Sequence, residues 1–118
     1  MSNQTLTVTA RSHPAGPHVL TVTGELDYHT STRLHQALDD VPLAPGTGLV
    51  IDLAGLTYCD STGITLLVTA YQRAEAIGAR FSLAATSPDL LRVFHIVGLD
   101  QVFSLQPTTE QAISALRT

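Results

Sequence analysis

A run of five residues in the middle of the chain, 49–53 (LVIDL), constrains the fold more than any other feature of the sequence. A strand that is covered on one face alternates apolar and polar residues, whereas a nearly continuous apolar run is typical of a central strand that is buried on both faces. Strands of this kind belong to sheets whose parallel neighbours are connected by helices. The run therefore predicts an α/β fold.

The segments on both sides of this run show the spacing of amphipathic helices. Apolar residues recur at i, i+3, i+4 and i+7 from Leu34 to Val41, and a second series with the helical period extends from Ile64 to Ala74. Each series places its apolar side chains on one side of a helix, where they can pack against a sheet. Pro42 is expected to stop the first helix, because proline has no amide hydrogen to donate.

The remaining elements are indicated by alternation and by helix caps. Residues 5–10 and 18–23 alternate polar and apolar positions, and the two prolines and the glycine between them favour an antiparallel hairpin. Ser87, followed by Pro88 and Asp89, is a typical helix start, with a capping hydroxyl, a proline in the first turn and a carboxylate at the positive end of the dipole. The predicted strands are 5–10, 18–23, 49–53, 81–85 and 102–105.

The predicted elements follow the order β-β-α-β-α-β-α-β-α. The last helix begins at a capping box formed by Thr108 and Gln111. Strand–helix–strand connections imply parallel pairing after the first hairpin, so we expect a mixed sheet of about five strands with about four helices. A chain of 118 residues supports one such core, and we expect a single domain over residues 1–118.

Charge and composition argue against several classes of function. The chain has ten acidic and six basic residues, a formal net charge of −4, and its basic residues are arginines scattered along the sequence. Nucleic-acid binding is not expected, because it needs a concentrated basic surface. No stretch approaches the about 20 apolar residues of a membrane span, and the chain start lacks a secretory signal, which favours the cytoplasm. The single cysteine and the five scattered histidines do not have the arrangement of a metal site.

The most informative motif, Asp60-Ser61-Thr62-Gly63, stands between the central strand and the second helix. Any of the first three side chains can cap that helix by accepting a hydrogen bond from a backbone amide, and capping alone would account for Asp60 or Ser61. Glycine in the first turn lowers helix propensity by about 1 kcal/mol relative to alanine. We therefore expect Gly63 to allow another molecule to approach the backbone closely.

Together with a second motif, this turn resembles a known family. Residues 50–63 (VIDLAGLTYCDSTG) and 23–27 (TGELD) are similar to the STAS domain, and specifically to the bacterial anti-sigma factor antagonists. The similarity continues through the helix at 64–78, through Ser87-Pro88 and through the closing helix, so it covers nearly the whole chain. The joint occurrence of these motifs at family-like spacing is much more specific than D-S-T-G alone.

The resemblance implies a function for the serine that follows the aspartate. In that family this serine is phosphorylated by an anti-sigma factor serine kinase, which makes Ser61 the expected phosphate acceptor. The kinase binds the ATP and magnesium, so no cofactor and no catalysis are expected in this chain. The unphosphorylated antagonist binds the kinase and frees the sigma factor, phosphorylation switches that binding off, and a PP2C-type phosphatase regenerates the antagonist.

The same resemblance predicts the surface that contacts the kinase. Asp27 and Asp60 fall on motif positions near the acceptor, and His29 is expected at the rim of the site. The predicted partner-binding residues are Asp27, His29, Asp60, Ser61, Thr62, Gly63 and Thr65.

Other interpretations of these residues remain open. A STAS module that is never phosphorylated would act as a scaffold or as a ligand-responsive binding module. A serine hydrolase would use Ser61 as its nucleophile, but D-S-T-G is not the G-x-S-x-G motif, and no histidine is placed as its base. A receiver-like protein would carry phosphate on Asp52, but it would need a lysine, and the chain has none. Cys59 is interpreted as a small buried packing residue.

Overall fold

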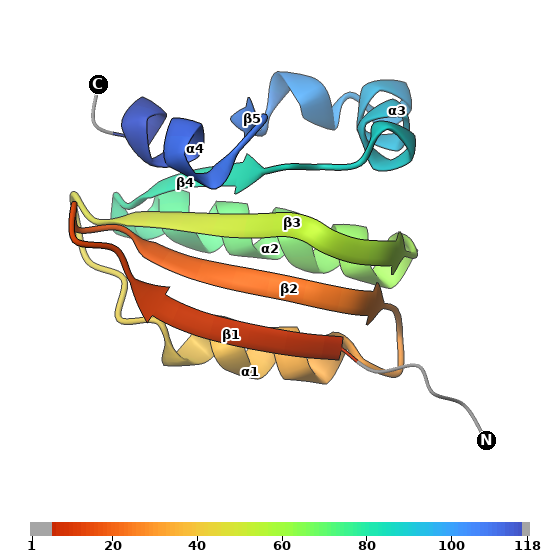
Figure 1. Cartoon of the computed structure of the whole chain (residues 1–118), viewed down its shortest axis with the longest axis horizontal. Helices are drawn as coiled ribbons and strands as arrows, with labels where there is room; N and C mark the ends of the chain where they lie inside the picture. Colours follow the sequence, from red (N-terminus) through yellow and green to blue (C-terminus); the bar gives the residue numbers. More distant parts are fainter. Residues whose placement is uncertain (1–5, 117–118) are drawn as a thin grey trace.

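The computed structural model describes residues 6–116, which form one five-stranded sheet in the order β1-β2-β3-β4-β5 (Figure 1). β1 and β2 pair antiparallel, and the other neighbours pair parallel, which confirms the predicted mixed α/β sheet and its order of elements. The strands are β1 (Leu6–Ser12), β2 (His18–Leu26), β3 (Gly48–Cys59), β4 (Arg80–Ala84) and β5 (Leu105–Gln106). The helices are α1 (Ser31–Asp40), α2 (Ser61–Ile77), α3 (Pro88–Val97), the short 3-10 helix η1 (Leu99–Gln101) and α4 (Thr109–Leu116).

Helices cover the two faces of the sheet unequally. α1 and α2 lie on one face, where they form the main core with side chains that include Leu49 and Ile51 (Figure 1). On the other face, Ala112 and Ile113 of α4 pack against a smaller cluster that contains Val50. Successive side chains of β3 therefore point into different cores, which explains why residues 49–53 are almost continuously apolar.

The central strand is longer than its sequence pattern predicts. β3 continues to Cys59, so residues 54–59, which follow the predicted end of the strand at Leu53, extend it. They pair with β2 as far as Leu26, across two register irregularities. β4 pairs only with residues 48–52 of β3, and most side chains beyond that point are exposed or half-buried. The apolar run therefore ends where the cover on both faces ends, although the strand itself continues.

The last strand is shorter than predicted. The sequence predicts a strand at 102–105, but β5 contains only Leu105 and Gln106. The residues before it follow η1 as an irregular segment, and Phe103 is buried there with its ring centroid 5.3 Å from that of Phe94. The apolar character of this segment therefore comes from core packing by a turn and not from strand pairing.

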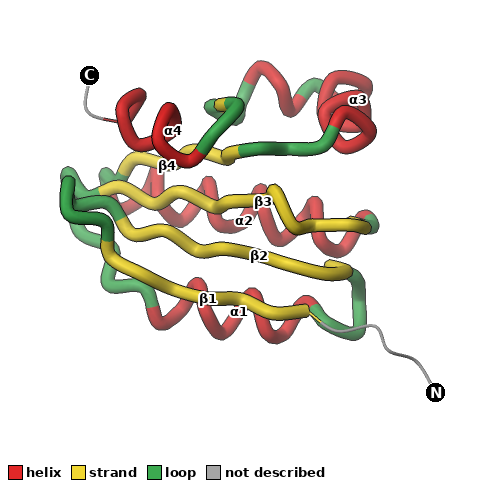
Figure 2. Tube along the Cα trace, viewed as in Figure 1, coloured by secondary structure: helices red, strands yellow, loops and turns green. Residues whose placement is uncertain are grey.

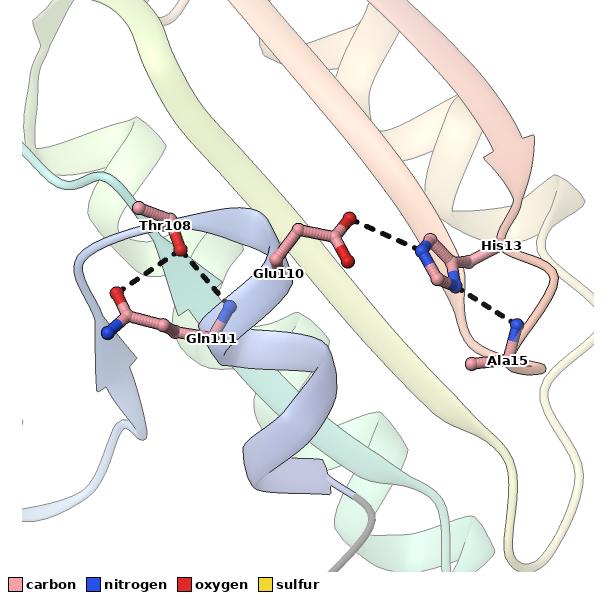
Figure 3. A network of polar contacts seen from close by, with 5 residues as sticks. All are labelled: His13, Ala15, Thr108, Glu110 and Gln111. Atoms are coloured by element: carbon pink, nitrogen blue, oxygen red, sulfur yellow. Dashed lines mark hydrogen bonds and ion pairs between the residues drawn. The ribbon is translucent and has the colours of Figure 1, made fainter.

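Two helices begin at the predicted caps. The Ser87 hydroxyl accepts a hydrogen bond from the Leu90 amide at 3.2 Å, and the Thr108 hydroxyl accepts one from the Gln111 amide at 3.1 Å. The Thr108 hydroxyl also donates a hydrogen bond to Oε1 of Gln111, at 3.2 Å. The predicted capping box is therefore formed in one half: Thr108 caps the Gln111 amide, while the Gln111 side chain bonds the Thr108 hydroxyl in place of its backbone amide (Figure 3).

A polar contact also connects α4 to the hairpin between β1 and β2 (Figure 3). Nδ1 of His13 accepts a hydrogen bond from the Ala15 amide at 3.0 Å, and Nε2 lies 3.3 Å from Oε2 of Glu110. Because Nδ1 is an acceptor here, the neutral ring carries its proton on Nε2, which faces the carboxylate. α4 is thus held on the sheet by apolar packing and by this contact.

Candidate functional site

The carboxyl ends of β2 and β3 meet at one end of the sheet, where each strand continues into a helix (Figure 2). Leu26 is paired with Cys59, and the amide of Asp60 donates a hydrogen bond to the carbonyl of Leu26 at 3.1 Å. The loop 27–30 therefore lies beside the turn that starts α2. The structure brings together the two sequence motifs, 23–27 and 50–63.

Asp60 is the residue that caps α2. Its Oδ1 atom accepts a hydrogen bond from the Gly63 amide at 3.0 Å, which is the usual geometry of an N-cap carboxylate. Its Oδ2 atom accepts a second hydrogen bond, from the Tyr28 amide at 3.2 Å. One carboxylate therefore fixes both the first turn of α2 and the loop after β2.

Asp27 organises the loop before α1. Its Oδ1 atom accepts hydrogen bonds from the amides of His29 at 2.9 Å and Thr30 at 3.0 Å, and from the Thr30 hydroxyl at 3.2 Å. Burial by itself raises the pKa of this carboxyl, but the donors on Thr30 and His29 outweigh burial and lower the pKa below its usual value. Asp27 is therefore a buried, ionised support of the loop, and its side chain is largely shielded from solvent.

Ser61 is the first residue of α2, and its side chain is exposed. Within residues 6–116 its hydroxyl has no hydrogen-bond partner, while its carbonyl accepts a hydrogen bond from the Thr65 hydroxyl at 2.9 Å. Thr62 is half-buried and Thr65 is exposed on the same helix. Of the three hydroxyls, that of Ser61 lies nearest the start of the helix and is free of internal contacts.

The structure explains the glycine at position 63 by packing inside the molecule, whereas the sequence predicts a close approach by another molecule. Gly63 is buried, and a Cβ atom added there would lie 2.7 Å from Sγ of Cys59 and 2.8 Å from Cγ of Leu26. The close approach is therefore between α2 and the ends of β2 and β3, inside the molecule. Gly63 sets how closely the site turn packs on the sheet and presents no side chain to a partner.

Cys59 agrees with its interpretation as a packing residue. It is half-buried against the main core, and its Sγ atom lies 3.6 Å from the carbonyl oxygen of Asp60. Burial, together with the nearby charge of Asp60, raises the pKa of the Cys59 thiol to about 12. The thiol is therefore protonated at neutral pH and is a poor nucleophile.

Two hollows flank the site turn. One, of about 380 Å³, is lined by the acidic residues and aromatic rings at the strand ends, and we call it the acidic hollow. The other, of about 530 Å³, lies between α1 and α2, and we call it the hydroxyl groove because five of its seven lining residues are serine or threonine. The acidic hollow is formed by Glu25, Asp27, Tyr28, His29, Tyr58 and Asp60. The hydroxyl groove is formed by Ser31, Thr32, His35, Thr62, Thr65, Leu66 and Thr69.

Most of the predicted site residues line these two hollows, together with residues that the sequence did not predict. Asp27, His29 and Asp60 line the acidic hollow, and Thr62 and Thr65 line the hydroxyl groove, so five of the seven predicted residues lie in these two hollows. Tyr28 and Tyr58, which are not among the predicted site residues, are both exposed large side chains at the site. An aromatic residue directly after the motif 23–27 and another within the motif 50–63 are the sequence signals that point to them.

The described residues give no support to the hydrolase or receiver interpretations. No histidine within residues 6–116 is hydrogen-bonded to the Ser61 hydroxyl, so that serine has no base in contact with it. Asp52 lies inside β3, and its carboxylate accepts a hydrogen bond from the Ala54 amide at 2.9 Å. Over the same part of the chain there is no group of three or more potential metal ligands. None of the helices between residues 6 and 116 is long and apolar enough to cross a lipid bilayer.

Known proteins show the same sequence pattern and the same fold. The sequence model described as the STAS domain matches residues 8–112. The anti-sigma-F factor antagonist RsfB of Mycobacterium tuberculosis is 33% identical over 114 residues, which are 95% of this chain and 90% of that protein. The anti-sigma-B factor antagonist of Listeria monocytogenes is 32% identical over 85 residues, which are 72% of this chain and 75% of that protein.

The similarity extends to solved structures. The crystal structure of an anti-sigma factor antagonist from Mycobacterium paratuberculosis matches with a TM-score of 0.87 at 32% sequence identity. The match covers 99% of this chain and 98% of that one. The fold is therefore shared over nearly the whole length of both chains.

Proposed function

Because this chain belongs to the STAS domain family, we propose that it acts in the bacterial cytoplasm as an anti-sigma factor antagonist. Its unphosphorylated form binds an anti-sigma factor serine kinase, which then releases its sigma factor. The kinase transfers phosphate to Ser61 and so switches the binding off, and a PP2C-type phosphatase restores it. The relatives are named as antagonists of anti-sigma factors, so this is the role of a regulatory binding protein rather than of an enzyme.

The observation that carries the proposal is the exposure of the Ser61 hydroxyl at the start of α2. The hydroxyl makes no hydrogen bond within residues 6–116, so a kinase can reach it without breaking an internal contact. Asp60 holds the turn from both sides, so the hydroxyl is presented on a fixed backbone. A kinase would supply ATP and magnesium, and this chain would supply only the acceptor oxygen.

The position of Ser61 also explains why the fold would survive phosphorylation. A phosphate at neutral pH adds about −1.5 to −2 charges. The positive end of a helix dipole and the free amides of its first turn favour a negative group at this place. The modification therefore adds charge to the surface with little strain inside the domain.

The same charge would be unfavourable in a complex. The acidic hollow already contains the carboxylates of Glu25, Asp27 and Asp60, and a partner docked over the turn would enclose the new phosphate beside them. Like charges that are brought together without water or counter-ions weaken an interface strongly. A complete switch from bound to free needs about 10⁴-fold in affinity, or ~5.5 kcal/mol, and a buried phosphate next to these carboxylates can supply several kcal/mol of it.

Intact-mass analysis tests the proposal directly. The chain is incubated with an anti-sigma factor serine kinase from the organism that encodes it, with magnesium and ATP, and any added phosphate is located by peptide mapping. We expect one phosphoryl group on Ser61, none in Ser61→Ala, and unchanged labelling in Thr62→Ala, which removes the neighbouring hydroxyl. Calorimetric titration should show tight binding of the unphosphorylated chain. After phosphorylation the affinity should fall by roughly a hundredfold or more.

Two results would contradict the proposal. Labelling of Ser61→Ala to the same extent as the parent would remove Ser61 as the acceptor. A stable complex in the presence of ATP, without any phosphate on the chain, would indicate a STAS scaffold that is not switched.

A further inference from the structure

α3 is unusually apolar for a helix at the edge of a domain. Of its ten residues (PDLLRVFHIV), only Asp89, Arg92 and His95 are polar. The helix nevertheless buries only two side chains, those of Leu90 and Phe94. A helix that is apolar on all sides is normally covered on all sides, so the composition of α3 exceeds what its place in this domain requires.

Three exposed apolar side chains of α3 lie together on one side of the helix. Val93, Ile96 and Val97 are spaced at i, i+3 and i+4, which places them along the same side of the helix. Their exposed fractions are 37%, 73% and 58%. We call these three residues the apolar ridge. Scattered exposed apolar residues are normal, whereas several on one helix side mark a surface that another molecule covers.

The apolar ridge is connected to the site turn through Tyr58. A hollow of about 290 Å³ lies between the end of β3 and the first turns of α3, and both Tyr58 and Val93 line it. Tyr58 is 53% exposed and also lines the acidic hollow, next to Asp60. Figure 1 shows α3 at the same end of the molecule as the carboxyl end of β3. Tyr58 therefore borders both the acidic hollow at the site turn and the hollow where the ridge begins at Val93.

The size and polarity of the site turn also call for such an extension. A specific complex buries about 800 Å² on each partner and involves roughly 20–30 residues a side. The seven predicted partner-binding residues, of which Asp27 is the first and Thr65 the last, are polar at every position except Gly63. The cores of stable interfaces are apolar and rich in aromatic residues, and the turn itself offers one exposed ring, that of Tyr28. Tyr58 and the apolar ridge add a second ring and apolar area.

We propose that the apolar ridge, together with Tyr58, is a docking surface for the same anti-sigma factor whose kinase site reaches Ser61. The partner would place an apolar side chain in the hollow between Tyr58 and Val93 and would cover Ile96 and Val97. This inference rests on the proposed function and adds to it, because it assigns affinity to α3 and leaves the switch at Ser61.

A pair of α3 variants tests the ridge. The double variant Ile96→Ser/Val97→Ser removes its two most exposed side chains. Leu91→Ser is the matched control: Leu91 is 38% exposed on the opposite side of α3, where it lines a separate hollow with Pro88 and Leu105. The probe is the purified anti-sigma factor kinase from the organism that encodes this chain, and binding is measured by calorimetric titration.

We expect the double variant to bind about tenfold or more weakly than the parent, as interface truncations in buried apolar positions do, and the control to stay within about twofold. The concentration of chain that gives half-maximal phosphorylation should rise by a similar factor, while the rate at saturation stays unchanged. Far-UV circular dichroism and the urea midpoint should match those of the control. Equal binding by parent and double variant, or equal losses in double variant and control, would overturn the assignment.

Sedimentation velocity separates the proposed partner from a second copy of this chain. The parent should be monomeric at the concentrations used for binding. A dimer of the parent that the double variant abolishes would overturn the proposal in favour of self-association. The parent alone tests the proposed function: a parent that neither binds the kinase nor becomes labelled overturns the proposed function and the docking surface together. A parent that binds and becomes labelled, beside a double variant that binds equally well, overturns only the docking surface.

Discussion

The carboxylate of Asp60 accepts a hydrogen bond from the amide of Tyr28 at 3.2 Å, across 32 positions of the sequence. Its other oxygen accepts from the Gly63 amide within the first turn of α2. The loop after β2 and the start of α2 are therefore held together by one side chain. The surface around Ser61 has its shape because two separate segments share this acceptor.

The first prediction concerns Asp60 itself. Asp60→Ala removes both acceptors, and we expect it to lower the free energy of unfolding by about 1–2 kcal/mol, the usual cost of losing an N-cap. Ser87→Ala is the matched control, because it removes the cap of α3 without touching the site. Urea unfolding measures the stability of both variants.

Hydrogen exchange distinguishes these two caps. In Asp60→Ala the Tyr28 amide loses its acceptor and should exchange faster than in the parent, whereas in Ser87→Ala it should be unchanged. If the Tyr28 amide were equally protected in both variants, the bond across the two loops would not hold the site together.

The second prediction concerns the packing at Gly63. An alanine there would gain about 1 kcal/mol of helix propensity, but its Cβ atom would lie 2.8 Å from Cγ of Leu26 and 2.7 Å from Sγ of Cys59. Overpacking of this kind costs about 1–3 kcal/mol, so Gly63→Ala should be destabilising by thermal and urea unfolding. A variant as stable as the parent would show that the interior can yield there.

A double-mutant cycle identifies the atoms responsible. Cys59→Ala removes the Sγ atom that the new methyl group meets, so the double variant Gly63→Ala/Cys59→Ala should be more stable than the sum of the single changes predicts. Strict additivity would mean that Leu26 alone, and not Cys59, limits the space at this position.

The third prediction is a dependence of stability on pH through Asp27. Burial raises the pKa of this carboxyl, but the hydrogen bonds from Thr30 and His29 lower the pKa by more than burial raises it. The folded pKa therefore lies below the unfolded value of about 4. The unfolded state then binds the proton more readily, and the contribution of Asp27 is fully present above about pH 4 and is lost as the pH falls through the folded pKa.

Asp27→Asn should therefore reduce stability at neutral pH and lose this disadvantage in acid. Urea midpoints measured between neutral pH and about pH 3 should converge for parent and variant as the pH falls. Asp40→Asn, at the exposed end of α1, is the control for the loss of one negative charge. A constant difference between parent and Asp27→Asn at every pH would contradict an ionised Asp27 in the folded state.

Much of the fold follows from local patterns, whereas the details of the site do not. The caps at Ser87 and Thr108 bond to amides three residues away, and burial on both faces makes residues 49–53 apolar, so both features can be read from one segment of the sequence. The length of β3 and the reason for Gly63 depend on contacts with β2, which lies far away in the sequence. The pattern along one segment does not show which distant strand packs against it, so β3 is longer than its pattern predicts and Gly63 makes its close contact inside the molecule and not with a partner.

The fourth prediction concerns the reactivity of Cys59. Burial and the charge of Asp60 raise the pKa of its thiol to about 12, so at pH 8 almost none of it is thiolate. A thiol with the ordinary pKa of about 8.5 is about one quarter thiolate at that pH, so alkylation of the folded chain should be slower on the order of a thousandfold. Labelling with iodoacetamide, followed by intact mass, measures the rate, and unfolding in urea should restore normal reactivity. Rapid labelling of the folded chain would show that the turn opens readily, and with it the fixed presentation of Ser61 would be lost.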